Sequence, residues 1–269
     1  MSPRSLQRWQ SWRAGGELLL RAFDYVSAAD ARTAEALSAL RHAPVPQLGN
    51  LKLAIAPPRV DAGAREALAQ EIGARPLWLA ASTHAGEDEI VIAAHAKLRE
   101  HAPDALLIIA PRHPERGADV ATLASNAPRR SRFEPIGNAP IYVADTLGEL
   151  GLFYDLAPVA LVAGSLLPEL KGHNPIEPAK LDCAIVTGPY VESFQDLFDA
   201  LTQAKAATVA RDADEIAAAV AALWKDSSAQ TGAARAIVDQ GATALDSTVA
   251  ALTALLSTRA AAEPAHASA

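Results

Sequence analysis

The feature that most constrains the fold is a series of short, fully apolar segments that alternate with amphipathic ones between residues 51 and 224. Examples are PLWLAA (76–81), ALLIIA (105–110) and CAIVT (183–187). Strands without a polar face are typical of a parallel sheet covered by helices on both sides, because neither face of such a sheet meets water. The alternation therefore predicts an α/β fold: a parallel, Rossmann-like sheet with helices on both faces.

The expected elements follow this alternation along the chain. We expect strands at residues 51–55, 76–81, 105–110, 140–144, 159–163, 183–187 and 207–210. We expect helices over residues 61–72, 86–99, 117–125, 147–154, 193–203, 213–224 and 229–256, and a short helix that begins at Asn174. Flanking helices without a strand are expected between residues 5 and 41, and the Pro- and Gly-containing segment HAPVPQLGN (42–50) marks the clearest domain boundary. The predicted parts are a helical segment (1–48), an α/β domain (49–226), and C-terminal helices with a frayed tail (227–269).

Bulk properties exclude several classes of protein. The net charge of −7 argues against nucleic acid binding, which needs a basic face. Cys183 is the single cysteine, so an intramolecular disulfide is excluded. No apolar run reaches the ~18 residues of a membrane span. The dinucleotide fingerprint GxGxxG, the phosphate-binding loop GxxxxGK[ST] and the nucleophile elbow GxSxG are all absent from the sequence.

The most informative stretch for function is LVAGSLLPELKGHNPIEPAK (161–180). An apolar strand ends at a Gly-Ser pair, a loop rich in Pro and Gly follows, and a short helix begins at Asn174. Such a connection directs free backbone N–H groups at an anion, and His173, Asn174 and Glu177 suit a ribose and a phosphate or carboxylate. An ordinary loop, with Asn174 as the helix cap and Glu177 favoured by the helix dipole, explains the same residues equally well.

Polar residues also follow the other predicted strands. Ser82, Thr83, His84 and Glu87 follow the strand at 76–81, PRHPER (111–116) follows the strand at 105–110, and Asp145, Thr146, Gly148 and Glu149 follow the strand at 140–144. Because ligands of an open parallel sheet bind at the carboxyl ends of its strands, we expect these groups to meet at one edge. Helix caps at Thr83 and Asp145, and a solvated basic turn at 111–116, are the competing explanations.

Taken together, these loops resemble the Kdo (3-deoxy-D-manno-octulosonic acid) transferases of lipopolysaccharide biosynthesis, which have the two-domain GT-B glycosyltransferase fold. The resembling stretches are SPRS (2–5), GNLKL (49–53), ASTHAGEDE (81–89), LLIIAPRHPER (106–116), ADTLGELGLFY (144–154), AGSLLPELKGHNPIEPA (163–179) and TGPYVESF (187–194). The sequence departs from the family at two positions, since Lys171 stands where the family usually has glycine and Ser193 where it usually has asparagine.

The resemblance implies that the complete enzyme transfers Kdo from CMP-Kdo to the lipid A precursor lipid IVA, with inversion and without a metal or other cofactor. It implies a peripheral protein on the cytoplasmic side of the bacterial inner membrane, or a cytoplasmic one if the membrane anchor is absent. Family members carry an acceptor-binding domain before the SPRS segment, with the anchor and the glutamate thought to act as general base. We therefore expect this chain to be the donor half, which binds CMP-Kdo and transfers Kdo poorly.

The resemblance also assigns donor-binding residues, whereas the catalytic residue is unknown in this chain. Arg112 and the backbones of Gly148 and Gly172 are expected to bind phosphate or carboxylate. The ribose hydroxyls are assigned to Glu177, with His173 and Asn174 nearby, and the sugar side to Ser82, His84 and Glu87. The remaining predicted donor-binding residues are Pro111, His113, Glu149, Leu150 and Ser165.

Two other classes of function stay open. One is a non-catalytic nucleotide-binding module, either a remnant or one half of a split enzyme. The other is a different GT-B transferase that uses a UDP-sugar.

Overall fold

The computed structural model describes residues 8, 9 and 11–262. The chain divides into two compact units, one of residues 1–55 with 239–269 and one of residues 56–238. Helix α11 (Ser228–Ala262) contributes residues to both units. The SPRS segment and the end of the expected tail lie outside the described residues. The predicted domain boundaries after residues 48 and 226 stay predictions.

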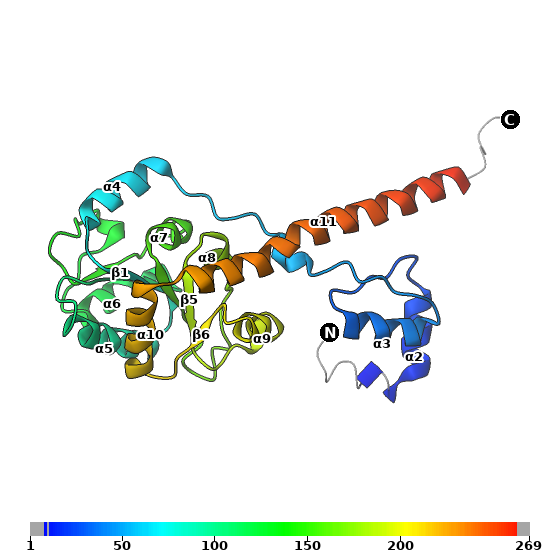
Figure 1. Ribbon diagram of the computed structural model, residues 1–269, viewed down its shortest axis with the longest axis horizontal. Helices are drawn as coiled ribbons and strands as arrows, with labels where there is room; N and C mark the ends of the chain where they lie inside the picture. Colours follow the sequence, from blue (N-terminus) through cyan, green and yellow to red (C-terminus); the bar gives the residue numbers. More distant parts are fainter. Residues whose placement is uncertain (1–7, 10, 263–269) are drawn as a thin grey trace. The chain divides into compact units, whose positions relative to one another are not determined.

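The unit of residues 56–238 contains a six-stranded sheet in the order β3-β2-β1-β4-β5-β6 (Figure 1). The strands are β1 (Leu77–Thr83), β2 (Leu106–Pro111), β3 (Ile141–Val143), β4 (Val159–Val162), β5 (Ala184–Thr187) and β6 (Thr208–Val209). Each strand pairs in parallel with its neighbours, so the predicted Rossmann-like sheet is confirmed. The chain adds strands on one side of β1 and then on the other, so the order reverses between β1 and β4. Sheets of this kind bind their ligands in the crevice at the carboxyl ends of the two strands at the reversal.

Helices cover both faces of this sheet. Trp78 and Ala80 of β1 pack toward α5, α6 and α10, whereas Leu77 and Leu79 pack toward α4 and α7, because successive strand residues point to opposite faces. The helices of this unit are α4 (Ala62–Ile72), α5 (Glu87–Arg99), α6 (Gly117–Leu123), α7 (Leu150–Leu156), α8 (Ile176–Lys180), α9 (Gln195–Gln203) and α10 (Ala213–Lys225), with 3-10 turns η2 (Pro114–Arg116), η3 (Arg130–Arg132) and η4 (Glu192–Phe194). Two buried faces explain why the strand sequences are apolar throughout.

The strand expected at residues 51–55 is not formed, and this prediction is corrected. These residues form the 3-10 turn η1 (Leu51–Ala54), which the Asn50 side chain caps by accepting a hydrogen bond from the N–H of Lys52 at 3.0 Å. Asn side chains that bond to a nearby backbone N–H favour turns over strands. The helix expected from residue 147 begins later, at Leu150, because residues 145–149 form a loop.

The smaller unit is built from helices. Helix α2 (Arg13–Arg21) packs on α3 (Ala31–Arg41) around a core that includes Leu20, Leu37 and Leu40. In the part of α11 that belongs to this unit, Gly241 lies against the backbone of Leu53, where a Cβ atom would approach the Leu53 carbonyl carbon to 2.2 Å. That contact excludes any side chain at this position. None of the helices between residues 8 and 262 is both long and apolar enough to span a bilayer.

Candidate functional site

The crevice at the carboxyl ends of β1 and β4 begins with an irregularity in β1. The register between β1 and β2 shifts between Ala81 and Thr83. Ser82 lies at this shift with φ 62°, a left-handed conformation that costs a non-glycine residue about 1–3 kcal/mol. Because the strand is kinked here, His84 reaches the loop that follows β4, where it contacts His173.

Glu87 ties the loops after β1 and β4 together. Its carboxylate is fully buried and accepts four backbone hydrogen bonds, from His84 (3.1 Å), Gly164 (2.8 Å), Ser165 (3.0 Å) and Leu166 (3.0 Å). An ionised carboxylate offers about four acceptor sites, so the protein itself uses all of them. The expectation that Glu87 lines the sugar side is therefore corrected: Glu87 positions two loops of the site and lies beneath its surface.

Ser165 is also buried and bonded within the protein. Its hydroxyl donates to the Val162 carbonyl at 2.8 Å and accepts from the N–H of Gly188 at 2.7 Å. Glycine is required at position 188, because a Cβ atom there would lie 2.0 Å from the Ser165 carbonyl oxygen. Ser165 thus joins the ends of β4 and β5, and its single O–H donor is used within the protein.

Three histidines meet at the crevice. The Nε2 atoms of His84 and His173 lie 2.9 Å apart with the rings stacked, and the His113 ring meets that of His84 edge-on at 5.8 Å. Gly164 makes room for this pair, since a Cβ atom there would lie 2.5 Å from the His173 ring. Burial, followed by the charges of His84, Arg112 and His113, lowers the pKa of His173 to about 4. Burial also lowers the pKa of His84, so the pair is neutral near pH 7.

Arg112 supplies a free positive charge beside this pair. It follows Pro111, the last residue of β2, and its backbone N–H donates to the Thr83 carbonyl at 2.9 Å. The side chain is exposed, and its guanidinium has no hydrogen-bond or ion-pair partner among the described residues. Arg116 differs, because it donates to the Thr83 carbonyl at 3.2 Å and pairs with the buried carboxylate of Asp88. The basic turn therefore combines a structural arginine with one that is available to an anion.

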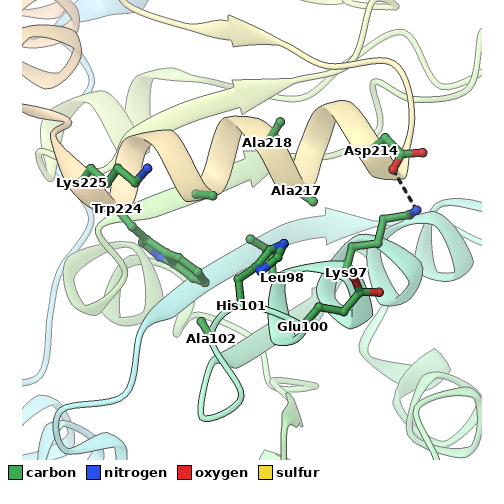
Figure 2. Close-up of a pocket in the computed structure, with 11 residues that line it drawn as sticks. Lys97, Leu98, Glu100, His101, Ala102, Asp214, Ala217, Ala218, Trp224 and Lys225 are labelled. Carbon is green, nitrogen blue, oxygen red and sulfur yellow. Dashed lines mark ion pairs between the residues drawn. The ribbon is translucent and has the colours of Figure 1, made fainter.

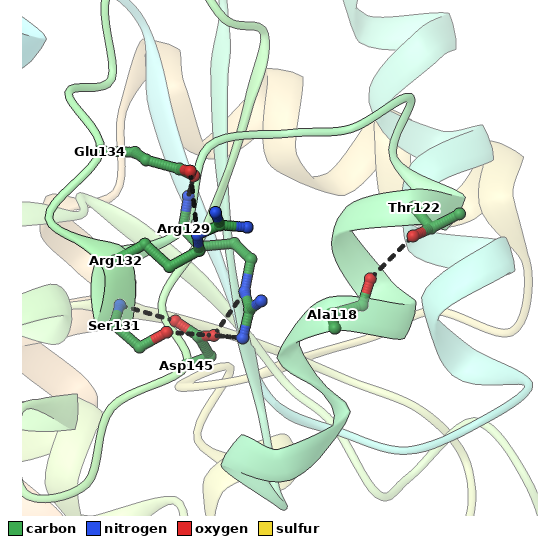
Figure 3. Close-up of polar contacts among 7 residues, drawn as sticks. All are labelled: Ala118, Thr122, Arg129, Ser131, Arg132, Glu134 and Asp145. Atoms are coloured by element: carbon green, nitrogen blue, oxygen red, sulfur yellow. Dashed lines mark hydrogen bonds and ion pairs between the residues drawn. The ribbon is translucent and has the colours of Figure 1, made fainter.

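The loop between β3 and α7 is held by a segment that the sequence interpretation missed. Asp145, expected as a possible helix cap, accepts instead from Arg129 Nε (2.8 Å), from the Ser131 N–H (2.9 Å) and from the Ser131 hydroxyl (2.8 Å), as Figure 3 shows. Glu149 pairs with Arg130 through two hydrogen bonds of 2.7 and 3.1 Å. The sequence did not predict these pairings, because Arg129 and Arg130 lie far along the chain from Asp145 and Glu149. Leu150, a predicted donor-binding residue, packs partly buried against the core.

The loop before α8 contributes the remaining predicted residues. The Asn174 side-chain oxygen accepts from the Ile176 N–H at 3.0 Å, which leaves its NH₂ group for a ligand. Glu177 is half-buried, burial raises its pKa, and its carboxylate has no hydrogen-bond or ionic partner among the described residues. The expectation that the Gly172 backbone binds phosphate or carboxylate is corrected. Its N–H is not free, because it donates to the Gly164 carbonyl at 2.6 Å. Glycine is needed there for packing, since a Cβ atom would lie 2.8 Å from Val191 Cα.

The structure thus brings the predicted residues to one edge of the sheet, in two groups. Arg112 and the three histidines form one group at the ends of β1, β2 and β4. Gly148 and Asn174 lie in the loops before α7 and α8, Glu177 lies in the first turn of α8, and these two helices pack against each other. No interaction among the described residues joins Glu177 to Arg112, so a ligand bound by both would have to bridge the two groups.

Other concave features lie away from this crevice or beside it. A groove of about 490 Å³ runs between α5 and α10 and is lined by residues that include His101 and Trp224, with an ion pair of 2.8 Å between Lys97 and Asp214 at its edge (Figure 2). Trp224 bonds to the Leu77 carbonyl at the start of β1, so this groove extends toward the opposite end of the sheet. A second hollow, of about 330 Å³, adjoins the carboxyl ends of β5 and β6. None of the residues predicted to bind the donor lines it.

The strand order, with its reversal between β1 and β4, defines a Rossmann-like domain of the kind that forms the C-terminal half of GT-B glycosyltransferases. The crystal structure of the C-terminal CMP-Kdo binding domain of WaaA from Acinetobacter baumannii is 31% identical, with a TM-score of 0.59, over 68% of this chain and 96% of that domain. The chain belongs to the family of 3-deoxy-D-manno-octulosonic acid transferases.

Curated relatives agree with this assignment. The protein named "Probable 3-deoxy-D-manno-octulosonic acid transferase, mitochondrial" from Arabidopsis thaliana is 35% identical over 224 residues, which is 78% of this chain and 50% of that protein. The 3-deoxy-D-manno-octulosonic acid transferase of Haemophilus influenzae is 40% identical over 155 residues, 55% of this chain and 36% of that protein. The chain therefore spans about half, or less, of the length of these relatives. No protein-family model matches it.

Proposed function

We propose that this chain binds CMP-Kdo and supplies the donor site of a Kdo transferase. The observation that carries the proposal is the exposed, unpaired guanidinium of Arg112 beside the His84–His173 pair, at the crevice where a Rossmann-like sheet binds its ligand. The similarity to a domain described as binding CMP-Kdo supports the choice of nucleotide sugar.

The donor places two negative charges, a phosphodiester and a sugar carboxylate, near a carbon that becomes cationic during transfer. Arg112 is assigned to one of these anions, because a guanidinium bonds to phosphate or carboxylate oxygens with two parallel N–H groups. The backbone N–H of Gly148 is assigned to the phosphate. Glu177 is assigned to the ribose hydroxyls, since its half-buried carboxylate has unused acceptor capacity, and the Asn174 amide lies beside it. Ser82, His84, His113 and His173 are assigned to the sugar side.

The reaction of the complete enzyme is part of the same proposal. Kdo passes from CMP-Kdo to the lipid A precursor lipid IVA by a single displacement, which inverts the anomeric carbon. Fixed cations and backbone dipoles stabilise the CMP leaving group, so the proposal includes no metal ion. The acceptor implies a peripheral position at the cytoplasmic face of the bacterial inner membrane.

Titration calorimetry with CMP tests the donor site. Arg112→Ala is expected to weaken CMP binding by at least about tenfold, because a hydrogen-bonded contact to a charged group contributes roughly 1.5–3 kcal/mol. Arg211→Ala is the matched control, since Arg211 is an exposed arginine that follows β6 and pairs with Glu215. Unchanged CMP affinity in Arg112→Ala would exclude the phosphate as the partner of Arg112, and unchanged CMP-Kdo affinity as well would exclude the sugar carboxylate.

Two further measurements separate the competing functions. Preference for UDP over CMP in the same calorimeter would indicate a UDP-sugar transferase. Transfer of Kdo from CMP-Kdo to lipid IVA by the 269-residue chain would exclude the non-catalytic interpretation.

Addition of EDTA tests the metal-independent proposal. It is expected to leave CMP affinity unchanged, and a loss of affinity would refute that proposal.

A further inference from the structure

The loop between β3 and α7 offers backbone donors to a ligand. The N–H groups of Leu147, Gly148 and Glu149 have no hydrogen-bond partner within residues 8–262 as described. Gly148 has φ 82°, and a Cβ atom on it would meet nothing within 4 Å, so no protein atom requires glycine at this position. Successive free N–H groups around a left-handed residue form a concavity that binds anions.

Two carboxylates flank these donors and oppose such binding. Asp145 lies at the start of the loop, and Glu149 is the residue directly after Gly148. Arg130 lowers the pKa of Glu149, and the hydrogen bonds from Ser131 and Arg129 lower the pKa of Asp145. Both carboxyl groups are therefore ionised near neutral pH. A negative charge within a few ångströms of a bound phosphate destabilises the complex unless a cation neutralises it.

Two consecutive arginines, the residue before η3 and the first residue of η3, neutralise both carboxylates. Arg129 pairs with Asp145, whose side chain is fully buried, and the closest approach is 2.7 Å. Arg130 bonds to both oxygens of Glu149, and the two partners are only about a quarter exposed, at 24% and 28%. The Thr146 hydroxyl bonds to Glu149 as well, at 2.5 Å. Both ends of the loop are therefore fixed by ion pairs, with the three free N–H groups between them.

We propose that Arg129 and Arg130 are positioning residues for the donor phosphate, which act through Asp145 and Glu149 and do not touch the donor. Arg129 fixes the start of the loop. Arg130 fixes the end and cancels the Glu149 charge beside the Gly148 N–H. This inference rests on the proposed CMP site and replaces the expectation that Glu149 itself contacts the donor.

Arg130 can be tested by separating its charge effect from its structural effect. Arg130→Gln leaves the Glu149 charge uncompensated, so CMP affinity is expected to fall about tenfold, whereas cytidine, which lacks the phosphate, is expected to bind within about twofold of wild type. Glu149→Gln in the Arg130→Gln background removes the repelling charge and is expected to restore most of the CMP affinity. Arg132→Gln is the matched control, because the neighbouring Arg132 is 65% exposed and pairs with Glu134 at 3.3 Å.

Glu149→Gln alone keeps the proposal testable if Arg130→Gln does not fold, which circular dichroism will show. It leaves Arg130 as an unpaired cation, so CMP is expected to bind a few-fold more tightly and cytidine equally well. Weaker cytidine binding in Glu149→Gln would show that Glu149 contacts the ribose and would overturn the proposal. Equal CMP affinity in wild type and a folded Arg130→Gln protein would also overturn it. Failure of wild type to bind CMP would instead refute the proposed function.

Discussion

The replacement Glu87→Gln tests whether one buried carboxylate holds the crevice together. Oε2 accepts from His84 and Gly164, and Oε1 accepts from Ser165 and Leu166. In either orientation the amide NH₂ of glutamine would face two backbone N–H donors, so two of the four hydrogen bonds are lost. A hydrogen bond to a charged group contributes ~1.5–3 kcal/mol, and relief of the buried charge offsets part of the loss. We expect the free energy of unfolding to fall by about 3–5 kcal/mol.

Thermal unfolding followed by circular dichroism measures this loss. For a domain of this size, 1 kcal/mol shifts the midpoint by roughly 2–4 °C, so the unfolding temperature is expected to fall by about 6–20 °C. Glu89→Gln is the control, because Glu89 lies two residues away in the first turn of α5 but is exposed. Its effect is expected within ~0.5 kcal/mol. If Glu87→Gln unfolds within about 1 kcal/mol of wild type, the four bonds do not organise the site as argued.

Two further predictions concern His173 and Lys171. The pKa of His173 is about 4 in the fold and near 6.5 in an unfolded chain, so unfolding takes up a proton between these values and stability is expected to fall as pH drops from about 6.5 toward 4. Urea denaturation across this pH range should show a shallower fall in the free energy of unfolding for His173→Gln than for wild type, whereas His101→Gln should follow wild type. Identical pH profiles for wild type and His173→Gln would contradict the lowered pKa of His173. Lys171 has φ 64°, a left-handed conformation that costs a non-glycine residue about 1–2 kcal/mol. Glycine avoids this cost, but its greater chain entropy in the unfolded state costs roughly 0.5–1 kcal/mol. Lys171→Gly is therefore expected to raise the free energy of unfolding by about 0.5–1 kcal/mol, and a decrease would refute this explanation of the departure from the family.

The sequence predicted the sheet well because a buried strand and its apolar pattern have the same cause. Ile108 and Ile109 of β2 are both fully buried, one toward each helical layer, and a segment without polar residues is the direct consequence. The prediction of a strand at residues 51–55 was wrong, because a short apolar segment also forms a turn when the Asn50 side chain caps it. Local patterns do not show whether a neighbouring strand is available for pairing.

The candidate site was predicted less completely. His84 and Arg112 follow the ends of β1 and β2, and His173, from the loop after β4, contacts His84, because carboxyl ends of parallel strands share one edge by geometry. The role of Glu87 was not predictable, because it depends on Gly164, which is 77 positions away along the chain.

What the sequence determined by itself is the order of strands and helices and the set of polar residues that follow the strands, because periodicity and turn chemistry act over a few neighbouring residues. The tertiary structure decided which of those polar groups remain free. Arg112 and Arg116 occur in the same turn, yet the carboxylate of Asp88 occupies one and leaves the other open. Likewise Glu149 is an ordinary loop acid until Arg130 is brought to it from 19 positions away. A charged group is neutralised by whatever charge the fold places beside it, and distance along the chain carries no information about that placement.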